Sequence, residues 1–115
     1  MKRVEAIIST EKVLELNEAL KKAGVGGWTI FESRGRGKGA KPMIESSRGT
    51  ARYVSEFSVR ANVLTVVADS QVEKVVNTIL DTVSTGSAGD GKIFISPVSD
   101  AADVGTKKRG EDAIS

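Results

Sequence analysis

The stretch Thr85-Gly86-Ser87-Ala88-Gly89-Asp90-Gly91-Lys92-Ile93-Phe94-Ile95 joins a helical pattern before it to a strand pattern after it. Glycines let backbone N–H groups converge on an anion, and Lys92 adds a positive charge. Gly86 to Lys92 fits the start of a P-loop, but Ile93 replaces the magnesium-binding Ser or Thr and a strand follows. The stretch is therefore a phosphate-binding loop of another kind, or a plain helix-to-strand connection with a C-cap at Gly86.

Outward from this stretch, strand and helix periods follow one another. Period-two alternation of apolar residues predicts a first strand over residues 3–8, and three- and four-residue steps predict a helix over 13–23. Ser9 or Thr10 is placed to cap that helix. Residues 28–32 predict a second strand that begins at Trp28, which we expect to fill the core.

The second half repeats the order of the first. Residues 53–68 read as one long strand, and a clean apolar stripe over 72–83 predicts a second helix, with Ser70 and Glu73 as a capping box. Residues 92–96 predict a last strand that stops at Pro97. The remaining tail, residues 99–115, is polar with little pattern, and we expect it to be mobile unless a neighbouring subunit holds it.

The resulting order β-α-β-β-α-β predicts an α+β protein of the ferredoxin-like class, with an antiparallel sheet and both helices on one face. The chain has 115 residues, of which 39% are hydrophobic, so we expect one domain over 1–115. The other face of the sheet has no predicted cover, and packing between copies would supply one. The sequence therefore predicts an oligomer.

Composition excludes several kinds of chemistry. The sequence has no Cys and no His, which rules out disulfides, thiolate or imidazole metal ligands, and Cys- or His-based catalysis. The amino-terminal residues lack the apolar core of a signal peptide, and no apolar run has membrane-spanning length. We expect a soluble, cytoplasmic protein.

Residues 34–52 form a basic stretch with no strand or helix period. It contains six basic residues and one acidic residue, Glu45, so its net charge is +5, whereas the net charge of the whole chain is +2. The cations are Arg34, Arg36, Lys38, Lys41, Arg48 and Arg52. This charge favours an anionic partner: a nucleotide's phosphates, a dicarboxylate, nucleic acid or an acidic protein surface. A solvated linker is the alternative.

With these pieces placed, the chain resembles the PII signal-transduction family over nearly its whole length. The resemblance rests on residues 2–8, on Ala23-Gly24-Val25-Gly26-Gly27-Trp28-Thr29, on residues 85–95 and on Arg109-Gly110-Glu111-Asp112-Ala113-Ile114. It implies a compact homotrimer that binds ATP or ADP in clefts between subunits, with Mg²⁺ and 2-oxoglutarate as further ligands. It also implies no catalytic role.

The family's named loops fall at defined places in this sequence. The long T-loop, about residues 37–55, separates strands two and three and contacts target proteins, such as an ammonium transporter at the inner face of the membrane or glutamine synthetase. The B-loop spans about residues 84–92, and the C-terminal loop lies in the tail. Family members regulate nitrogen assimilation through these contacts, and no nucleic-acid partner is expected.

The resemblance assigns roles residue by residue. Lys92 and its neighbours would hold phosphates, while Ile7 and Val66 could instead be core residues and Thr29 an ordinary strand residue. The nucleotide-binding set is Ile7, Thr29, Gly35, Gly37, Lys38, Val66, Thr85, Gly86, Gly89, Asp90, Gly91 and Lys92. Gly39 and Arg60 fall at the effector site, and Lys41, Arg48, Arg52 and Tyr53 in the target-binding loop.

Three departures from the family's pattern bear on function. Gly39 stands where a Gln helps to hold magnesium and 2-oxoglutarate, and glycine has no side-chain oxygen, so a reduced 2-oxoglutarate response is expected. Arg60 stands where the family has a Lys; it keeps the positive charge, but Arg and Lys are not interchangeable. Asp103 and Gly105 replace two phosphate-binding Arg residues, although Lys107 and Lys108 follow closely.

Two other function classes compete with that of a non-enzymatic regulator. A nucleic-acid-binding module could use the basic stretch, but the five aromatic residues form no RNP-like run. A phosphate-cleaving enzyme would need a placed base or nucleophile, and Asp90 has no His or Cys to assist it. The regulator is favoured: bound phosphates would draw the T-loop base inward, and their absence would release it.

Overall fold

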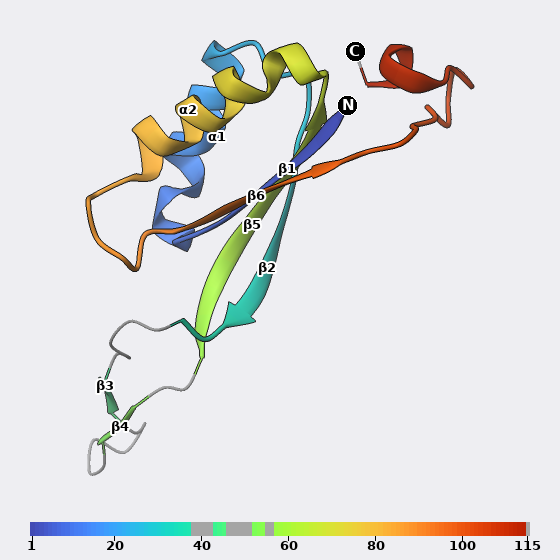
Figure 1. The fold of residues 1–115 in the computed structure, drawn as a ribbon. Coiled ribbons are helices and arrows are strands. Elements are labelled where there is room, and N and C mark those ends of the chain that lie inside the picture. The colour runs from blue at the N-terminus through green and yellow to red at the C-terminus, as the bar shows by residue number, and fades with distance from the viewer. Residues whose placement is uncertain (38–42, 46–51, 55–56, 115) are drawn as a thin grey trace.

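A computed structural model describes residues 1–37, 43–45, 52–54 and 57–114 (Figure 1). The main elements are β1 (Lys2–Ile8), α1 (Val13–Lys22), β2 (Thr29–Gly35), β3 (Met43–Glu45), β4 (Arg52–Val54), β5 (Ser58–Val67), α2 (Val72–Val83) and β6 (Gly91–Pro97). Short 3₁₀ turns, Thr10–Lys12 and Asp69–Gln71, precede the two helices, and a third, Gly110–Ala113, lies in the tail.

Four strands form one antiparallel sheet in the order β2-β5-β1-β6. Both helices lie on the same face of this sheet (Figure 1). Figure 1 also shows the T-loop end of the sheet and the tail at opposite ends of the molecule. The ferredoxin-like α+β prediction is confirmed, and one face of the sheet, which we call the open face, has neither helix over it.

The strand register decides which side chains meet the helices. Ala6 pairs with Val63 on one side and with Ile93 on the other, so these three side chains share a face. On β1, alternate residues are fully buried, as expected for a strand with one face against a core. The buried core consists of Val4, Ala6, Ile8, Leu16, Leu20, Ala61, Val63, Val75, Ile79 and Val83.

The remaining β1 positions, Arg3, Glu5 and Ile7, point to the open face together with their cross-strand partners. Ile7 lies level with Asn62 of β5 and Lys92 of β6, and Arg3 lies level with Val66. Ile7 and Val66 are half-buried and lie outside the core cluster. Their alternative reading as core residues beneath the helices is therefore wrong.

Two predictions about the middle of the chain are wrong. The basic stretch does contain strands: β2 continues to Gly35, and β3 pairs with β4 in a second, two-stranded sheet. The long strand expected over 53–68 is two strands, β4 and β5. Gly35 stays in β2 because it pairs with Ser58, so a cross-strand partner outweighs the weak strand preference of glycine.

The helix starts follow the prediction only in part. The Ser9 hydroxyl accepts from the Glu11 N–H at 3.4 Å, capping the 3₁₀ turn that leads into α1. Ser70 instead lies inside the second 3₁₀ turn, whose cap residue is Ala68 and which has no side-chain cap bond. The predicted capping box is therefore absent, because the chain begins to coil before Ser70.

Trp28 packs against the core, as predicted. Its indole Nε1 donates to Asn17 Oδ1 of α1 at 3.0 Å, which satisfies the one polar atom of a half-buried ring.

Among the described residues, no helix combines the length and the apolar character needed to cross a bilayer.

Candidate functional site

The B-loop is shaped around the carboxylate of Asp90. Asp90 Oδ2 accepts from the backbone N–H of Thr85 at 2.6 Å and of Ser87 at 3.2 Å, and Oδ1 accepts from the Thr85 hydroxyl at 2.5 Å. The Thr85 hydroxyl, then its backbone N–H, holds the pKa of Asp90 below the ordinary value. Asp90 is therefore ionised at neutral pH and braces the loop from within.

Gly91 fixes where the loop lies on the sheet. Its φ of +138° is outside the range that side chains normally allow, and a Cβ at this position would lie 2.2 Å from the Ile7 carbonyl oxygen. Gly86 has φ +87°, but α2 already ends at Val83 with Ser84 as its C-cap, so the predicted C-cap at Gly86 is wrong. The predicted glycine requirement is thus strongest at Gly91, where the B-loop passes over the end of β1.

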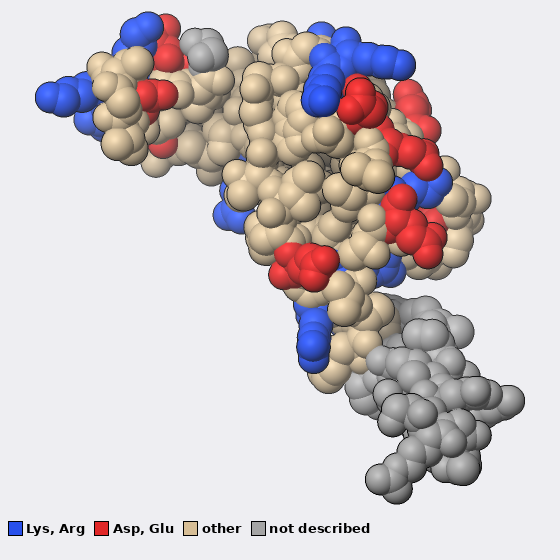
Figure 2. Space-filling model, turned by 180° about the vertical axis from the view of Figure 1, so that it is seen from behind, with Lys and Arg blue, Asp and Glu red and all other residues tan. Residues whose placement is uncertain are grey.

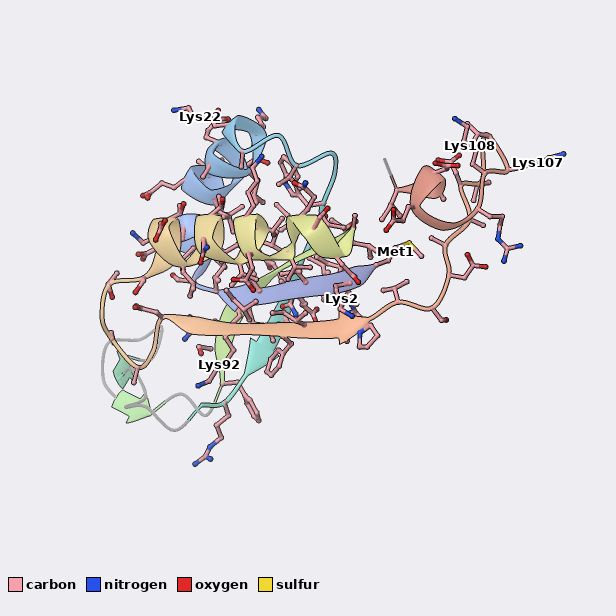
Figure 3. All side chains as sticks on the ribbon, turned by 45° about the horizontal axis from the view of Figure 1, so that its top comes forward. Met1, Lys2, Lys22, Lys92, Lys107 and Lys108 are labelled. Atoms are coloured by element: carbon pink, nitrogen blue, oxygen red, sulfur yellow. The ribbon has the colours of Figure 1, made fainter. Side chains whose placement is uncertain are left out.

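Lys92 projects on the open face beside Ile7. Figure 3 shows its side chain on the side of β6 away from the helices. Lys92 is exposed, and it directly follows the close approach at Gly91. The loop therefore places a cation at a fixed point at one end of the open face.

Arg60 approaches the B-loop from the middle of the sheet. β1 ends at Ile8, opposite Ala61, so the next β5 residue, Arg60, has no β1 residue beside it. Its guanidinium donates to the Gly89 carbonyl oxygen at 2.8 Å. The side chain thus spans the space left by the end of β1 and contacts the B-loop directly.

The remaining predicted nucleotide residues divide into two groups. The first, the B-loop group, gathers at one end of the sheet: Ile7, Gly35 at the end of β2, Thr85, Gly86 and residues 89–92. Arg60, which was predicted for the effector site, lies beside this group. Gly37 follows β2 at the same end.

The second, the distal group, consists of Thr29 and Val66. Val66 pairs with Arg3, four residues along β1 from Ile7, a separation of about 13 Å. Thr29 lies on the other edge strand, three strand positions from β6, or about 14 Å. Thr29 is exposed on the strand surface.

The C-terminal tail forms a turn of its own at the far end of β6. The Asp103 carboxylate accepts from the Thr106 N–H at 2.9 Å, and this contact holds the Asp103 pKa below its ordinary value. Ala102 pairs with Arg109 across the turn, and Arg109 also forms an ion pair with Asp100. Although the sequence of the tail shows little pattern, its described residues form this turn and the 3₁₀ turn Gly110–Ala113.

Lys107 and Lys108 are carried by this turn and not by the B-loop end. Figure 3 shows them beyond one end of β6, while Lys92 lies near the other end. A β-strand of seven residues such as β6 spans roughly 20 Å. Within one chain, these cations therefore cannot replace the missing arginines at the B-loop of the same chain.

A cavity of about 440 Å³ lies next to the B-loop but on the helix side of β6. Its walls are mainly apolar side chains of α2 and β6, including Val76, Leu80 and Ile95, with Asp90 and Lys92 also contributing. Neither Thr29 nor Val66 belongs to this lining. The cavity therefore does not join the B-loop group to the distal group.

The predicted residues of the T-loop are described only in part. Arg52 and Tyr53 belong to β4, whereas four others lie outside the described residues: Lys38, Gly39, Lys41 and Arg48. The described residues contain no cluster of three or more acidic side chains suited to a metal ion.

One polar network was not predicted. Ser33 Oγ of β2 donates to Asn62 Oδ1 at 2.5 Å, and Asn62 Nδ2 donates to Glu5 Oε2 of β1 at 3.2 Å. Asn62 is buried although it points to the open face. The only sequence signal is a polar residue in an apolar strand, which does not identify its partners.

Comparisons with known proteins cover nearly the whole chain. The family model described as "Nitrogen regulatory protein P-II" matches residues 1–108. Two proteins named nitrogen regulatory protein P-II, from Cereibacter sphaeroides and Azospirillum brasilense, are 44% and 40% identical to this chain. The namesake from Microchaete diplosiphon is 43% identical. Each match covers 99% of this chain and 100% of the relative.

Proposed function

The chain belongs to the nitrogen regulatory protein P-II family, and we propose that it is a non-enzymatic signalling protein that binds ATP or ADP between the subunits of a homotrimer. In this proposal, the B-loop group of one subunit holds the phosphates. The distal group and tail of the next subunit hold the rest of the nucleotide.

The division of the predicted site residues into two groups carries this proposal. Lys92 and Val66 both point to the open face, but they are separated by two strand positions and about 13 Å along the strands. Lys107 and Lys108 lie beyond the other end of β6 (Figure 3). A second copy that brings its distal group and tail to the B-loop would complete one compact site from two half-sites.

The open face also has the character of a surface that another chain covers. Phe31 is 44% exposed and Phe94 57% exposed, and both point to this face with Leu64. Seen from behind in Figure 2, a broad part of the molecule carries no charged side chain. Exposed aromatic residues grouped on one sheet face favour burial between subunits.

The phosphate end of the site favours a polyanion. Lys92 contributes a full charge at a position fixed by Gly91, and Arg60 lies on the same face. A response to 2-oxoglutarate with Mg²⁺ is a weaker expectation, because Gly39 has no oxygen to offer a metal.

The downstream role follows from the family. Bound nucleotide would set the conformation of the T-loop, and the T-loop would report it to a protein of nitrogen assimilation. An ammonium transporter or glutamine synthetase is the kind of target proposed, reached from the cytoplasm or at the inner face of the membrane.

A mixed-trimer experiment tests the two half-sites directly. Lys92→Ala removes the phosphate cation, and Thr29→Phe blocks the distal group at an exposed strand position that tolerates an aromatic residue. Each variant alone is expected to bind ATP weakly in calorimetry. Trimers co-expressed from both variants should regain binding at each junction where an intact B-loop group meets an intact distal group.

Sedimentation of the purified chain supplies the control for assembly. A trimer that binds ATP, with binding restored in mixed trimers, supports the proposal. A monomer at micromolar concentration contradicts it, and so does a trimer in which mixing restores nothing. Titrations with ADP and AMP, each with and without 2-oxoglutarate, then rank the ligands.

A further inference from the structure

Arg60 contacts the B-loop without belonging to it. The guanidinium reaches the Gly89 carbonyl oxygen at 2.8 Å from β5, twenty-nine residues earlier in the chain. Other hydrogen bonds of the B-loop join residues within it: the backbone N–H groups of Thr85 and Ser87 donate to Asp90, and that of Gly89 donates to the Ser87 hydroxyl. Local bonds set the shape of a loop, but a bond to a distant strand sets its position.

The position of Arg60 in the register explains the reach. Ile8 pairs with Ala61 and is the last residue of β1, so β5 continues beyond the end of its neighbour. Arg60 pairs with Ser33 of β2 on its other side. Only a long side chain can cross the strand position that β1 leaves open, a distance of about 10 Å from β5 to β6.

The anchor for this contact is rigid. Two residues along β5 from Arg60, and on the same face, Asn62 accepts a hydrogen bond from Ser33 of β2 at 2.5 Å and donates one to Glu5 of β1 at 3.2 Å. Asn62 is only 6% exposed. This network ties three strands together directly beside Arg60, so the guanidinium starts from a fixed backbone.

The bond also constrains the peptide that leads into Asp90. Because the Gly89 carbonyl oxygen is held by Arg60, the Gly89–Asp90 peptide has one orientation, and the Asp90 N–H points to the Ser87 carbonyl oxygen at 3.2 Å. At the other end of the loop, Gly91 is held against Ile7. The segment between these two contacts leads directly to Lys92.

We propose that Arg60 is a positioning residue for phosphate binding: it fixes the B-loop over the end of β1 before a nucleotide arrives. The proposal rests on the proposed function, since the positioned loop is the one that would hold the phosphates. Arg60 acts here through Gly89 and not as a ligand of the phosphates themselves. An arginine suits this role because its fork keeps one geometry while it donates.

Hydrogen exchange in the nucleotide-free protein tests the positioning. The N–H groups of Thr85, Ser87, Gly89 and Asp90 all donate within the loop, so their exchange rates report its order. Arg60→Ala should raise these rates and weaken ATP binding about tenfold or more, the effect of one lost hydrogen bond from a charged donor. Arg60→Lys should restore part of both, because an ammonium can still donate to one carbonyl.

Arg34→Ala is the matched control. Arg34 lies at the same end of the sheet, opposite Val59, one register position from the Ser33–Arg60 pair and therefore on the other face. This variant should change neither the B-loop exchange rates nor the ATP affinity. Equal melting temperatures for both alanine variants would show that the effect is local.

Each result decides one point. Weaker ATP binding with unchanged exchange in the free protein would make Arg60 a phosphate ligand and overturn the positioning role. Faster exchange with unchanged affinity would also overturn it, because the position of the loop would not matter for binding. If the wild-type protein binds no nucleotide, the proposed function fails, while the exchange rates still decide whether Arg60 holds the loop.

Discussion

The B-loop and the C-terminal tail turn are built alike around an aspartate, but they are attached differently. Asp90 accepts backbone N–H groups in the first turn and Asp103 in the second. The B-loop is also fixed to the sheet, through Gly91 against Ile7 and Arg60 to Gly89. The bonds that shape the tail turn, such as Asp103 N–H to the Lys108 carbonyl oxygen, join tail residues to one another.

The two turns also differ in which residue types have a positive φ. In the B-loop, the positions with positive φ are Gly86 and Gly91. In the tail turn, Lys107 has φ +64°, where a side chain costs about 1–2 kcal/mol. A turn fixed to the sheet thus carries unstrained residues, while the tail turn accepts strain at a residue that the proposed function uses as a cation.

Gly91→Ala should have the largest effect, because it would separate the B-loop from the sheet. The added Cβ would lie 2.2 Å from the Ile7 carbonyl oxygen at a φ of +138°. We expect a loss of about 3–5 kcal/mol of unfolding free energy, measured by urea denaturation. Gly89→Ala is the control, since its Cβ would meet only the Ser87 hydroxyl at 3.8 Å. Equal losses for both variants would contradict the close approach.

Lys107→Gly should stabilise the tail turn by a smaller amount. Glycine removes the left-handed penalty but adds freedom to the unfolded chain, which leaves a gain of about 0.5–1 kcal/mol. Lys108→Gly is the control. It removes the same charge, but among the described non-glycine residues only Lys107 has a positive φ, so no left-handed penalty is relieved at Lys108. Thermal melts should therefore rise for the first variant and not for the second. A loss of stability for Lys107→Gly would show that the tail turn is not strained.

Thr85→Val should have the smallest effect, a change in the pKa of the Asp90 carboxyl group. The Thr85 hydroxyl is the largest cause of the lowered Asp90 pKa, so its removal should raise that pKa toward the ordinary 3.8. Because the folded-state pKa is lowered, the bracing by Asp90 is complete above 3.8 and is lost as pH falls through the lowered value.

Carbon-13 NMR titration of the side-chain carboxyl groups measures this shift. Asp103 is the internal control, because its lowered pKa depends on Thr106. Its titration midpoint should be the same in wild type and Thr85→Val. A shift of both carboxylates, or of neither, would contradict the separate bracing of the two turns.

The sequence predicts the B-loop well because its signals are local. Three glycines and a lysine between a helix period and a strand period require a turn, and Gly91 proves to be a position that only glycine can fill. The strand order follows from the succession of periods, and both helices lie where their apolar stripes predict them.

The tail turn and the Arg60 contact could not be predicted because their signals are not local. Lys107 occupies a backbone conformation that its residue type does not suggest. Arg60 meets Gly89 only because β1 ends one residue short of it, and strand lengths come from tertiary pairing. The pairing of Gly35 with Ser58 likewise extended β2 past the predicted boundary.

The central place of β1 in the sheet also has a consequence for synthesis on the ribosome. Its two partners come much later in the sequence: Ile8 pairs with Ala61, and Lys2 pairs with Pro97. Until β6 has left the exit tunnel, one edge of β1 has no strand to pair with. Such long-range pairing slows folding and leaves a nascent apolar strand open to association with other chains. We therefore expect the nascent chain to need chaperone protection until β6 is complete.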